Sequence, residues 1–333
     1  MNEVKKKRKL TVLGRFVIIL FIGVLFGASL GFYYRLTNDN IKKDDVEEHK
    51  QEEEAVSKKE EMDASLVMVG DALIHSTIYE DAYTGEGYDF KPMLKEIKPM
   101  VEDYDLKYYN QETILGGTEL GLSNYPRFNS PYEVGDAFID AGFNLVSLAT
   151  NHTMDKGEVG VINSLNYWNS KDDVYTAGSY LSFEDRDEVV IKEINGITYS
   201  FFSYTTWTNG LETPSGKEYL NNVYSPEKAQ ADILKVRNQV DVVIVAMHWG
   251  TEYSTSVSSE QQEIANYLSS LGVDIIIGTH PHVVEPIAFI GKTMVIYSLG
   301  NFISDQEGVE RLTGLMASID IHKTVENGVS TIE

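Results

Sequence analysis

The chain has 333 residues, no cysteine and a formal net charge of −23 at pH 7. This length allows one large domain or two smaller ones, and the apolar fraction of 42% argues against global disorder. The absence of cysteine excludes disulfides, thiolate metal sites and cysteine nucleophiles. The acidic balance argues against nucleic acid as a partner, because phosphate contacts need a basic face.

The N-terminus combines a basic head, residues 1–15, with an apolar run. Residues 16–34 are uncharged, and at ~1.5 Å per residue they span roughly the ~30 Å hydrocarbon thickness of a bilayer. A cleaved signal peptide is the alternative, but the run is long for one and no clear cleavage site follows it. We therefore predict a single transmembrane anchor over 16–35. The positive-inside rule then puts the N-terminus in the cytoplasm and the rest of the chain outside the cell membrane.

Residues 36–63 form a charged segment in which aspartates and glutamates alternate with lysines. The segment has almost nothing to bury, so it is predicted to be either a solvated helix or an extended spacer. We interpret it as a linker that holds a domain, residues 64–333, away from the bilayer.

In the first half of the domain, short apolar runs of β type alternate with helical ones. Proline is tolerated at the first position of a helix, so Ser130-Pro131 marks a helix start. Strands are expected at 65–69, 106–110 and 144–149, and helices at 130–142 and 157–169.

The second half is richer in strands. Asn195-Gly196 is a strong hairpin signal between apolar runs at 189–194 and 197–204. Strands buried on both faces and alternating with helices indicate a layered α/β fold, and the hairpins indicate a mixed sheet or two sheets. Further strands are expected at 241–247, 273–277, 283–290, 293–298 and 314–321, and helices at 226–238 and 258–271.

Histidines gather where predicted strands end. In open α/β sheets the carboxyl ends of the strands are where ligands bind. His49, in the linker, and His322, near the end of the chain, are interpreted as inert. The other five of the seven histidines lie at or just after a strand end: His75, His152, His248, His280 and His282.

Other metal-ligating residue types accompany these histidines. Asp71, Glu112 and Asn151 each follow a predicted strand, and Asp155 comes shortly after Asn151. Asp71 alone would also fit a helix N-cap, and Asn151 alone a left-handed turn. Together with imidazoles, carboxylate and amide oxygens suit Zn, Mn or Fe. The set is too large for one ion, so two ions ~3.5–4 Å apart are expected.

These blocks resemble, in chain order, the metal-binding motifs of calcineurin-like metallophosphoesterases. The whole set is more closely similar to the CapA/PgsA family of poly-γ-glutamate capsule biosynthesis proteins. The resemblance covers residues 65 to 306, and the preceding anchor fits the layout of the family. Its segments are 69–71, 110–112, 151–155, 248–253, 280–286 and 297–302.

The resemblance implies a four-layer α/β/β/α sandwich of metallophosphoesterase type with a two-metal site. Asp71 and His282 would hold one metal ion, and Glu112 would lie between the two ions. Asn151, His248 and His280 would hold the other ion. His152 and Asp155 are the catalytic candidates, with His152 as an acid or as a stabiliser of a transferring phosphoryl or acyl group.

The sequence departs from the phosphoesterase pattern at two places. Asp71 and His75 are four positions apart where the pattern has Asp-x-His, and Asn110-Gln111-Glu112 replaces an aspartate block. The resemblance implies a role in poly-γ-glutamate synthesis or export, with membrane subunits of a synthase and an anionic polymer or envelope precursor as partners. A metal-dependent phosphoesterase or hydrolase acting on another envelope substrate is the alternative.

Overall fold

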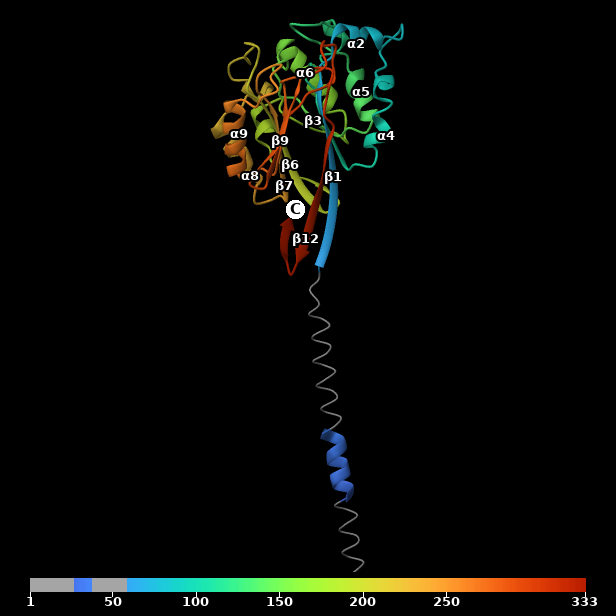
Figure 1. Ribbon diagram of the computed structural model, residues 1–333, viewed down its shortest axis with the longest axis vertical. Coiled ribbons are helices and arrows are strands. Elements are labelled where there is room, and N and C mark those ends of the chain that lie inside the picture. Colours follow the sequence, from blue (N-terminus) through green and yellow to red (C-terminus); the bar gives the residue numbers. More distant parts are fainter. Residues whose placement is uncertain (1–26, 38–58) are drawn as a thin grey trace, which may run out of the picture. The chain divides into compact units, whose positions relative to one another are not determined.

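The computed structural model describes residues 27–37 and 59–333 (Figure 1). Residues 27–37 are helical and belong to one compact unit, and a second unit comprises Glu60–Val325 with Ser330–Glu333. In these described ranges, no helix combines the length and the apolar character needed to cross a membrane. The expected anchor at 16–35 and linker at 36–63 lie mostly outside the described residues.

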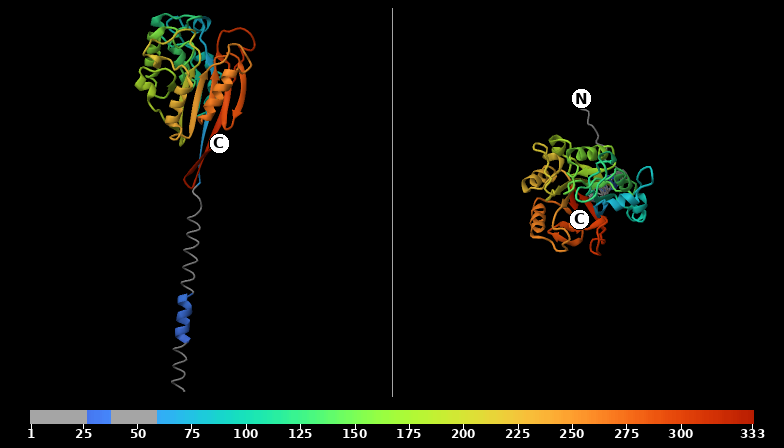
Figure 2. Two further views of the ribbon diagram at one scale, coloured as in Figure 1. Left: turned by 90° about the vertical axis from the view of Figure 1, so that its left-hand side faces the viewer. Right: turned by 90° about the horizontal axis from the view of Figure 1, so that it is seen from above.

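The first sheet has seven strands in the order β13-β12-β1-β2-β3-β4, with β11 pairing beside β1. Strands β1 to β4 run parallel, so their carboxyl ends meet at one edge. The long strands β1 and β12 lie side by side (Figures 1 and 2). The strands are β1 (Lys59–Ala72), β2 (Leu106–Asn110), β3 (Leu145–Ser147), β4 (Tyr175–Ala177), β11 (Asn301–Ile303), β12 (Ala317–Glu326) and β13 (Val329–Ile332).

The second sheet has six strands in the order β5-β6-β7-β8-β10-β9. Its four central strands are parallel, and a hairpin closes each side. Asn195 and Gly196 have φ of 51° and 83°, as a tight hairpin turn with two left-handed residues requires. The strands are β5 (Lys192–Ile194), β6 (Ile197–Thr205), β7 (Val242–His248), β8 (Ile275–Thr279), β9 (Val284–Ile290) and β10 (Thr293–Leu299).

Three apolar clusters hold these layers together. Leu66 of β1 and Ile244 of β7 belong to one cluster, so the two sheets pack face to face. A second cluster joins the other face of the first sheet to α5 and α6, and a third joins the second sheet to α8 and α9. The helices are α2 (Ser76–Asp81), α3 (Lys91–Leu94), α4 (Lys98–Val101), α5 (Glu133–Asp140), α6 (Gly157–Trp168), α7 (Phe183–Asp187), α8 (Pro226–Val236) and α9 (Ser259–Ser270).

The predicted mixed α/β fold with two sheets is confirmed, and the differences lie in short or polar elements. Strand β1 begins at Lys59, five residues before the predicted start of the domain at residue 64. Its first residues are polar and carry no strand signal of their own. They form a strand because β12 lies next to β1 in the sheet, and tertiary pairing of this kind can override local propensity. The three-residue strands β4 and β11 were not predicted, because such short segments carry too little periodicity.

Candidate metal centre

Polar side chains gather at the carboxyl ends of two parallel strands in each sheet, β1 and β2 in the first sheet and β7 and β8 in the second. Asp71 of β1 lies opposite Asn110 of β2, and His248 of β7 lies opposite Thr279 of β8. All four side chains are buried. Because buried polar groups need partners, their mutual contacts decide what this edge can bind.

The loop after β8 carries the two most unusual backbone conformations of the site. His280 and His282 have φ of 96° and 59°, values that residues with a Cβ adopt rarely. Each such residue costs of order ~1–3 kcal/mol and persists only where the surrounding structure enforces it. Pro281 lies between them, and both imidazoles are buried. Strain of this kind at two ligand-type residues of one short loop points to a binding role.

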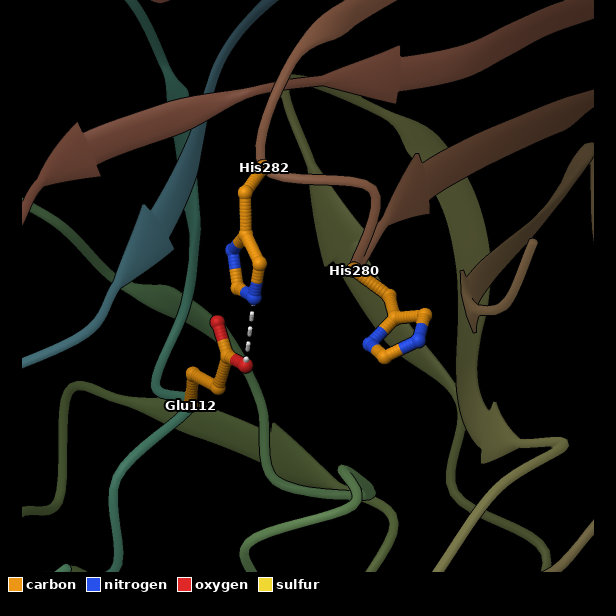
Figure 3. A group of neighbouring side chains, drawn as sticks. All are labelled: Glu112, His280 and His282. Atoms are coloured by element: carbon orange, nitrogen blue, oxygen red, sulfur yellow. Dashed lines mark ion pairs between the residues drawn. The ribbon is translucent and has the colours of Figure 1, made fainter. Parts of the chain in front are cut away.

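Glu112, His280 and His282 form a buried group that can hold a metal ion. One ligand atom from each lies within 4.8 Å of the others. His282 is directed at the Glu112 carboxylate, with 3.6 Å between Nε2 and Oε1 (Figure 3). Both carboxylate oxygens of Glu112 and Nδ1 of His280 are buried without a hydrogen-bond partner in the described chain. Buried polar atoms without hydrogen-bond partners are costly, so these atoms fit a divalent cation.

Asp71 and Asn151 each contact an imidazole that neighbours Glu112. The Asp71 carboxylate lies 3.3 Å from His282 Nδ1, and its other oxygen accepts a 2.8 Å hydrogen bond from Asn110. Asn151 Oδ1 lies 2.9 Å from His248 Nε2, which is itself 3.8 Å from Glu112 Oε1. The structure therefore brings the other five predicted metal residues together around Glu112. Which of them ligate an ion, and how many ions bind, stay predictions.

Burial and charge perturb the acids and imidazoles of this group in opposite directions. Burial raises the pKa of the Glu112 carboxyl well above its usual value, and it lowers the pKa of His280 to about 3. Burial also lowers the pKa of His248. For His282, burial is outweighed by the carboxylates of Glu112 and Asp71, which raise its pKa to about 9. Glu112 and His282 thus compete for one proton, and a bound cation would supply the positive charge instead.

The predicted catalytic residues form a separate pair beside this group. Nδ1 of His152 lies 2.7 Å from Oδ2 of Asp155, and the same oxygen accepts a 2.6 Å hydrogen bond from the backbone N–H of Phe128. The imidazole packs edge-on against the Phe128 ring at 4.8 Å. The carboxylate therefore fixes the orientation of the ring and leaves Nε2 as the atom that can exchange a proton.

His75 does not join the group. Its Nδ1 lies 3.2 Å from the backbone N–H of Asp305, and its half-buried ring packs edge-on against Phe128. Asp71 and His75, which are four positions apart where the phosphoesterase pattern has Asp-x-His, therefore supply one member of the group instead of two.

Two asparagines take up contacts that the sequence analysis did not assign. Asn110 donates to Asp71 and lies 3.3 Å from His248 Nδ1, and Asn301 Oδ1 lies 3.0 Å from His282 Nδ1. Each thereby orients a predicted ligand. Their position at the end of a buried strand was the available signal, since Asn110 is the last residue of β2 and Asn301 lies two positions after the end of β10.

A comparison with protein families identifies the relatives of this chain. The family model described as bacterial capsule synthesis protein PGA_cap matches residues 65–306. The chain belongs to this family. The matched range is the one over which the sequence motifs predicted such a relationship, and that prediction is confirmed.

Two curated relatives come from Bacillus. The PGA biosynthesis protein CapA of Bacillus subtilis (strain 168) is 34% identical over 175 residues, 50% of this chain and 44% of that protein. The capsule biosynthesis protein CapA of Bacillus anthracis is 28% identical over 264 residues, 75% of this chain and 62% of that protein. The matched regions thus span less than two thirds of the length of either relative.

Solved structures share the fold at low sequence identity. A putative 5'-nucleotidase from Staphylococcus aureus in complex with alpha-ketoglutarate superposes with a TM-score of 0.52 and 17% identity, over 81% of this chain and 53% of that chain. The calcineurin-like phosphoesterase YfkN from Bacillus subtilis gives a TM-score of 0.47 and 17% identity, over 82% of this chain and 91% of that chain. The first likeness supports the mixed α/β fold with two sheets and says nothing of activity.

Proposed function

We propose that this chain is a membrane-anchored protein of poly-γ-glutamate capsule synthesis or export, with its domain outside the cell and divalent metal bound around Glu112. Membership of the capsule synthesis family and the names of its Bacillus relatives support the pathway. The basic head and apolar run of residues 1–35 support the anchor. Membrane subunits of a polymer synthase and the anionic polymer itself are the partners that this function requires.

The observation that carries the metal proposal is the Glu112 carboxylate. Both of its oxygens are buried without a hydrogen-bond partner within the described residues, and the imidazoles of His280 and His282 lie close to it. Asp71 and His282 are proposed to hold one ion, and Asn151, His248 and His280 a second, with Glu112 shared. Zinc, manganese and iron all suit these donors. A four-layer arrangement of helices outside two sheets, as the resemblance implied, is consistent with the three apolar clusters.

A divalent ion bound here would supply positive charge that lowers the pKa of water and stabilises a developing oxyanion. The chain's own residues can perform two further tasks at this site. Asn110 and Asn301 orient the Asp71 carboxylate and the His282 ring. His152, oriented by Asp155, can give or take a proton at Nε2.

The test combines metal content with polymer production. In a poly-γ-glutamate-producing strain that lacks its own copy, we expect the full-length chain to restore the polymer. His280→Ala should reduce both the metal bound by the purified protein and the polymer formed. His322→Ala is the matched control, because His322 is exposed and pairs with Asp63 away from the strand ends. No divalent metal in the wild-type protein would overturn the metal proposal, and full polymer production without the chain would overturn the pathway.

The geometry of His152 and Asp155 favours a second candidate, a metal-dependent phosphoesterase or hydrolase acting on another envelope substrate. A histidine held by a buried carboxylate beside a metal site is the arrangement that proton transfer needs. Hydrolysis of bis-p-nitrophenyl phosphate by the wild-type chain, abolished in His152→Ala with metal content unchanged, would favour the enzyme. Equal rates in wild type and variant would favour a non-catalytic subunit.

A further inference from the structure

A cavity of about 400 Å³ opens beside His152, at the edge of the candidate metal centre. Its wall includes the exposed aromatic rings of Tyr125 and Trp207 and, from other segments of the chain, Arg127 and Glu252. Neither Arg127 nor Glu252 forms a salt bridge with another residue of ranges 27–37 and 59–333. A cation and an anion that do not neutralise each other therefore face one cavity.

The segment that carries Arg127 is hydrogen-bonded to the candidate catalytic pair, His152 and Asp155. Ser123 and Asn129 form an antiparallel bridge, and the Ser123 hydroxyl donates a 2.6 Å hydrogen bond to the carbonyl of Arg127. The next residue, Phe128, donates its N–H to the Asp155 carboxylate that holds His152. The turn that presents Arg127 and Tyr125 is thus fixed relative to His152.

The remaining wall is tied to the metal group. Asn209, which lines the cavity, accepts a 3.4 Å hydrogen bond from Asn151 Nδ2. Burial is the first cause of the raised pKa of Glu112, whereas for His282 burial lowers the pKa and the carboxylates of Glu112 and Asp71 outweigh it. In both cases Glu252 lies near enough to the group for its charge to contribute to the rise in pKa. A ligand in the cavity therefore lies next to the atoms that would hold metal.

The charges in the wall select the chemistry of the ligand. A purely anionic segment would meet Arg127 but be repelled by Glu252, and a purely cationic one would meet the reverse problem. A group with a carboxylate and an ammonium on the same carbon satisfies both. In a γ-linked glutamate chain the amino-terminal residue is such a group, because its α-carboxylate and α-ammonium are both free while its side-chain carboxyl forms the amide link.

We propose that the cavity beside His152 binds the amino-terminal residue of a γ-linked glutamate chain, with its α-carboxylate on Arg127 and its α-ammonium on Glu252. The methylene groups of the residue lie against Trp207 and Tyr125, and the rest of the chain extends toward the metal group. This proposal depends on the proposed function in its choice of polymer, but its binding contacts belong to the cavity alone.

The fluorescence of Trp207 offers a direct measurement. The chain has three tryptophans, and Trp207 is 60% exposed whereas Trp168 and Trp249 are 2% and 0% exposed. Titration of the full-length protein with γ-linked triglutamate should therefore change the emission of Trp207 and its quenching by acrylamide. The same titration with N-acetylated γ-linked triglutamate removes only the ammonium charge.

Two variants test the two proposed charged contacts of the ligand one at a time. Arg127→Gln should weaken binding of both trimers roughly tenfold or more, because a charge-assisted hydrogen bond is lost. Glu252→Gln should weaken binding of the free trimer by a similar factor and leave the acetylated trimer unchanged. Lys292→Gln and Glu263→Gln, which remove one exposed charge each outside the cavity, are the matched controls and should bind as wild type does.

The outcomes keep this proposal apart from the proposed function. Equal affinity of wild type, Arg127→Gln and Glu252→Gln for the free trimer would overturn the cavity assignment, as would an acetylated trimer that binds wild type as tightly as the free one. Metal content of each protein is measured in parallel. A wild-type protein without metal that still discriminates the two trimers through Glu252 would overturn the metal proposal and support the cavity assignment.

Discussion

Carboxylates lie at both ends of the parallel strands, and those at the amino ends accept hydrogen bonds that join neighbouring segments. Asp105, Asp241 and Asp274 directly precede β2, β7 and β8. Asp105 accepts hydrogen bonds from the N–H and hydroxyl of Ser65, and Asp274 from the N–H of Val243 and the guanidinium of Arg237. Each pairing fastens a strand to its neighbour or to a helix.

At the carboxyl ends Asp71 accepts hydrogen bonds, but the carboxylate of Glu112 lacks hydrogen-bond partners within the described residues. Glu112 follows β2 with both carboxylate oxygens buried and no hydrogen bond within the described residues, and His280 and His282 follow β8 with strained backbones. The same strands form both edges, so the intrinsic strand propensity of their residues does not explain why hydrogen bonding differs between the two edges. One edge satisfies its charges within the chain and stabilises the fold, whereas the other keeps donors available for a ligand.

The largest effect expected is that of metal on the carboxyl edge. Manganese or zinc at about a thousand times its Kd should raise the free energy of unfolding by about 4 kcal/mol, since the ion binds the folded state. In Glu112→Gln this gain should largely disappear, as measured by unfolding with and without metal. Glu263→Gln is the control that keeps the gain. Equal metal stabilisation of Glu112→Gln and wild type would contradict the assignment of Glu112.

Gly70→Ala should disturb the same edge through the backbone. A Cβ at this position would lie 1.8 Å from the carbonyl oxygen of Gly300, which accepts the N–H of Asp71 at 3.0 Å. We expect a loss of about 3 kcal/mol in the free energy of unfolding, together with weaker metal binding. Gly87→Ala meets nothing within 4 Å and should be nearly neutral in both denaturant unfolding and metal titration. A tolerated Gly70→Ala would show that the two strand ends are less closely packed.

Lys323→Met tests the amino edge. Lys323 of β12 donates 2.6 Å and 3.0 Å hydrogen bonds to Asp241 and to the carbonyl of Gly196, and the ion-paired side chains are 14% and 13% exposed. Losing one partner of this largely buried pair should cost about 2 kcal/mol at pH 7, with metal binding unchanged. Lys292→Met, at an exposed position, is the control.

The pH dependence of that loss has a definite sign. Burial alone would raise the pKa of Asp241, but Lys323 and Thr198 outweigh it and lower the pKa below its ordinary value of 3.8. The pair's contribution is therefore complete above about pH 4 and is lost as the pH falls through the folded-state pKa. Denaturant unfolding of wild type and Lys323→Met should give a constant difference from pH 7 to pH 5 that narrows below pH 4. A difference that grows on acidification would refute the pairing.

The smallest effect expected is that of Asp105→Asn. Asp105 Oδ2 accepts two hydrogen bonds from Ser65, and Oδ1 accepts one from Asn195. Asparagine keeps only one acceptor oxygen, so about 1 kcal/mol of the free energy of unfolding should be lost without any change in metal affinity. Asp103→Asn, at an exposed neighbouring position, should change neither quantity in the same unfolding experiment. A metal-binding defect in Asp105→Asn would mean that the two edges are coupled.

Local signals predicted much of the framework. Strand β2 ends at Asn110 as expected, the Asn195-Gly196 turn has two positive φ angles, and α9 begins with a capping box of Ser258 and Gln261. Elements that depend on distant partners were missed. The polar start of β1 and the three residues of β11 form strands because other segments pair with them, and a local pattern does not contain that information.

For the candidate site, the sequence by itself determined which residue types follow the buried strands, and so the ligand types and the family. The tertiary structure decided their partners: Asp71 accepts the N–H of His280, 209 positions away, and Asn110 and Asn301 orient ligands that lie far along the chain. Periodicity reports only near neighbours, whereas hydrogen-bond satisfaction of a buried group depends on every segment that surrounds it. For that reason the lack of a hydrogen-bond partner for the buried Glu112 carboxylate, which carries the metal proposal, became visible only in the folded chain.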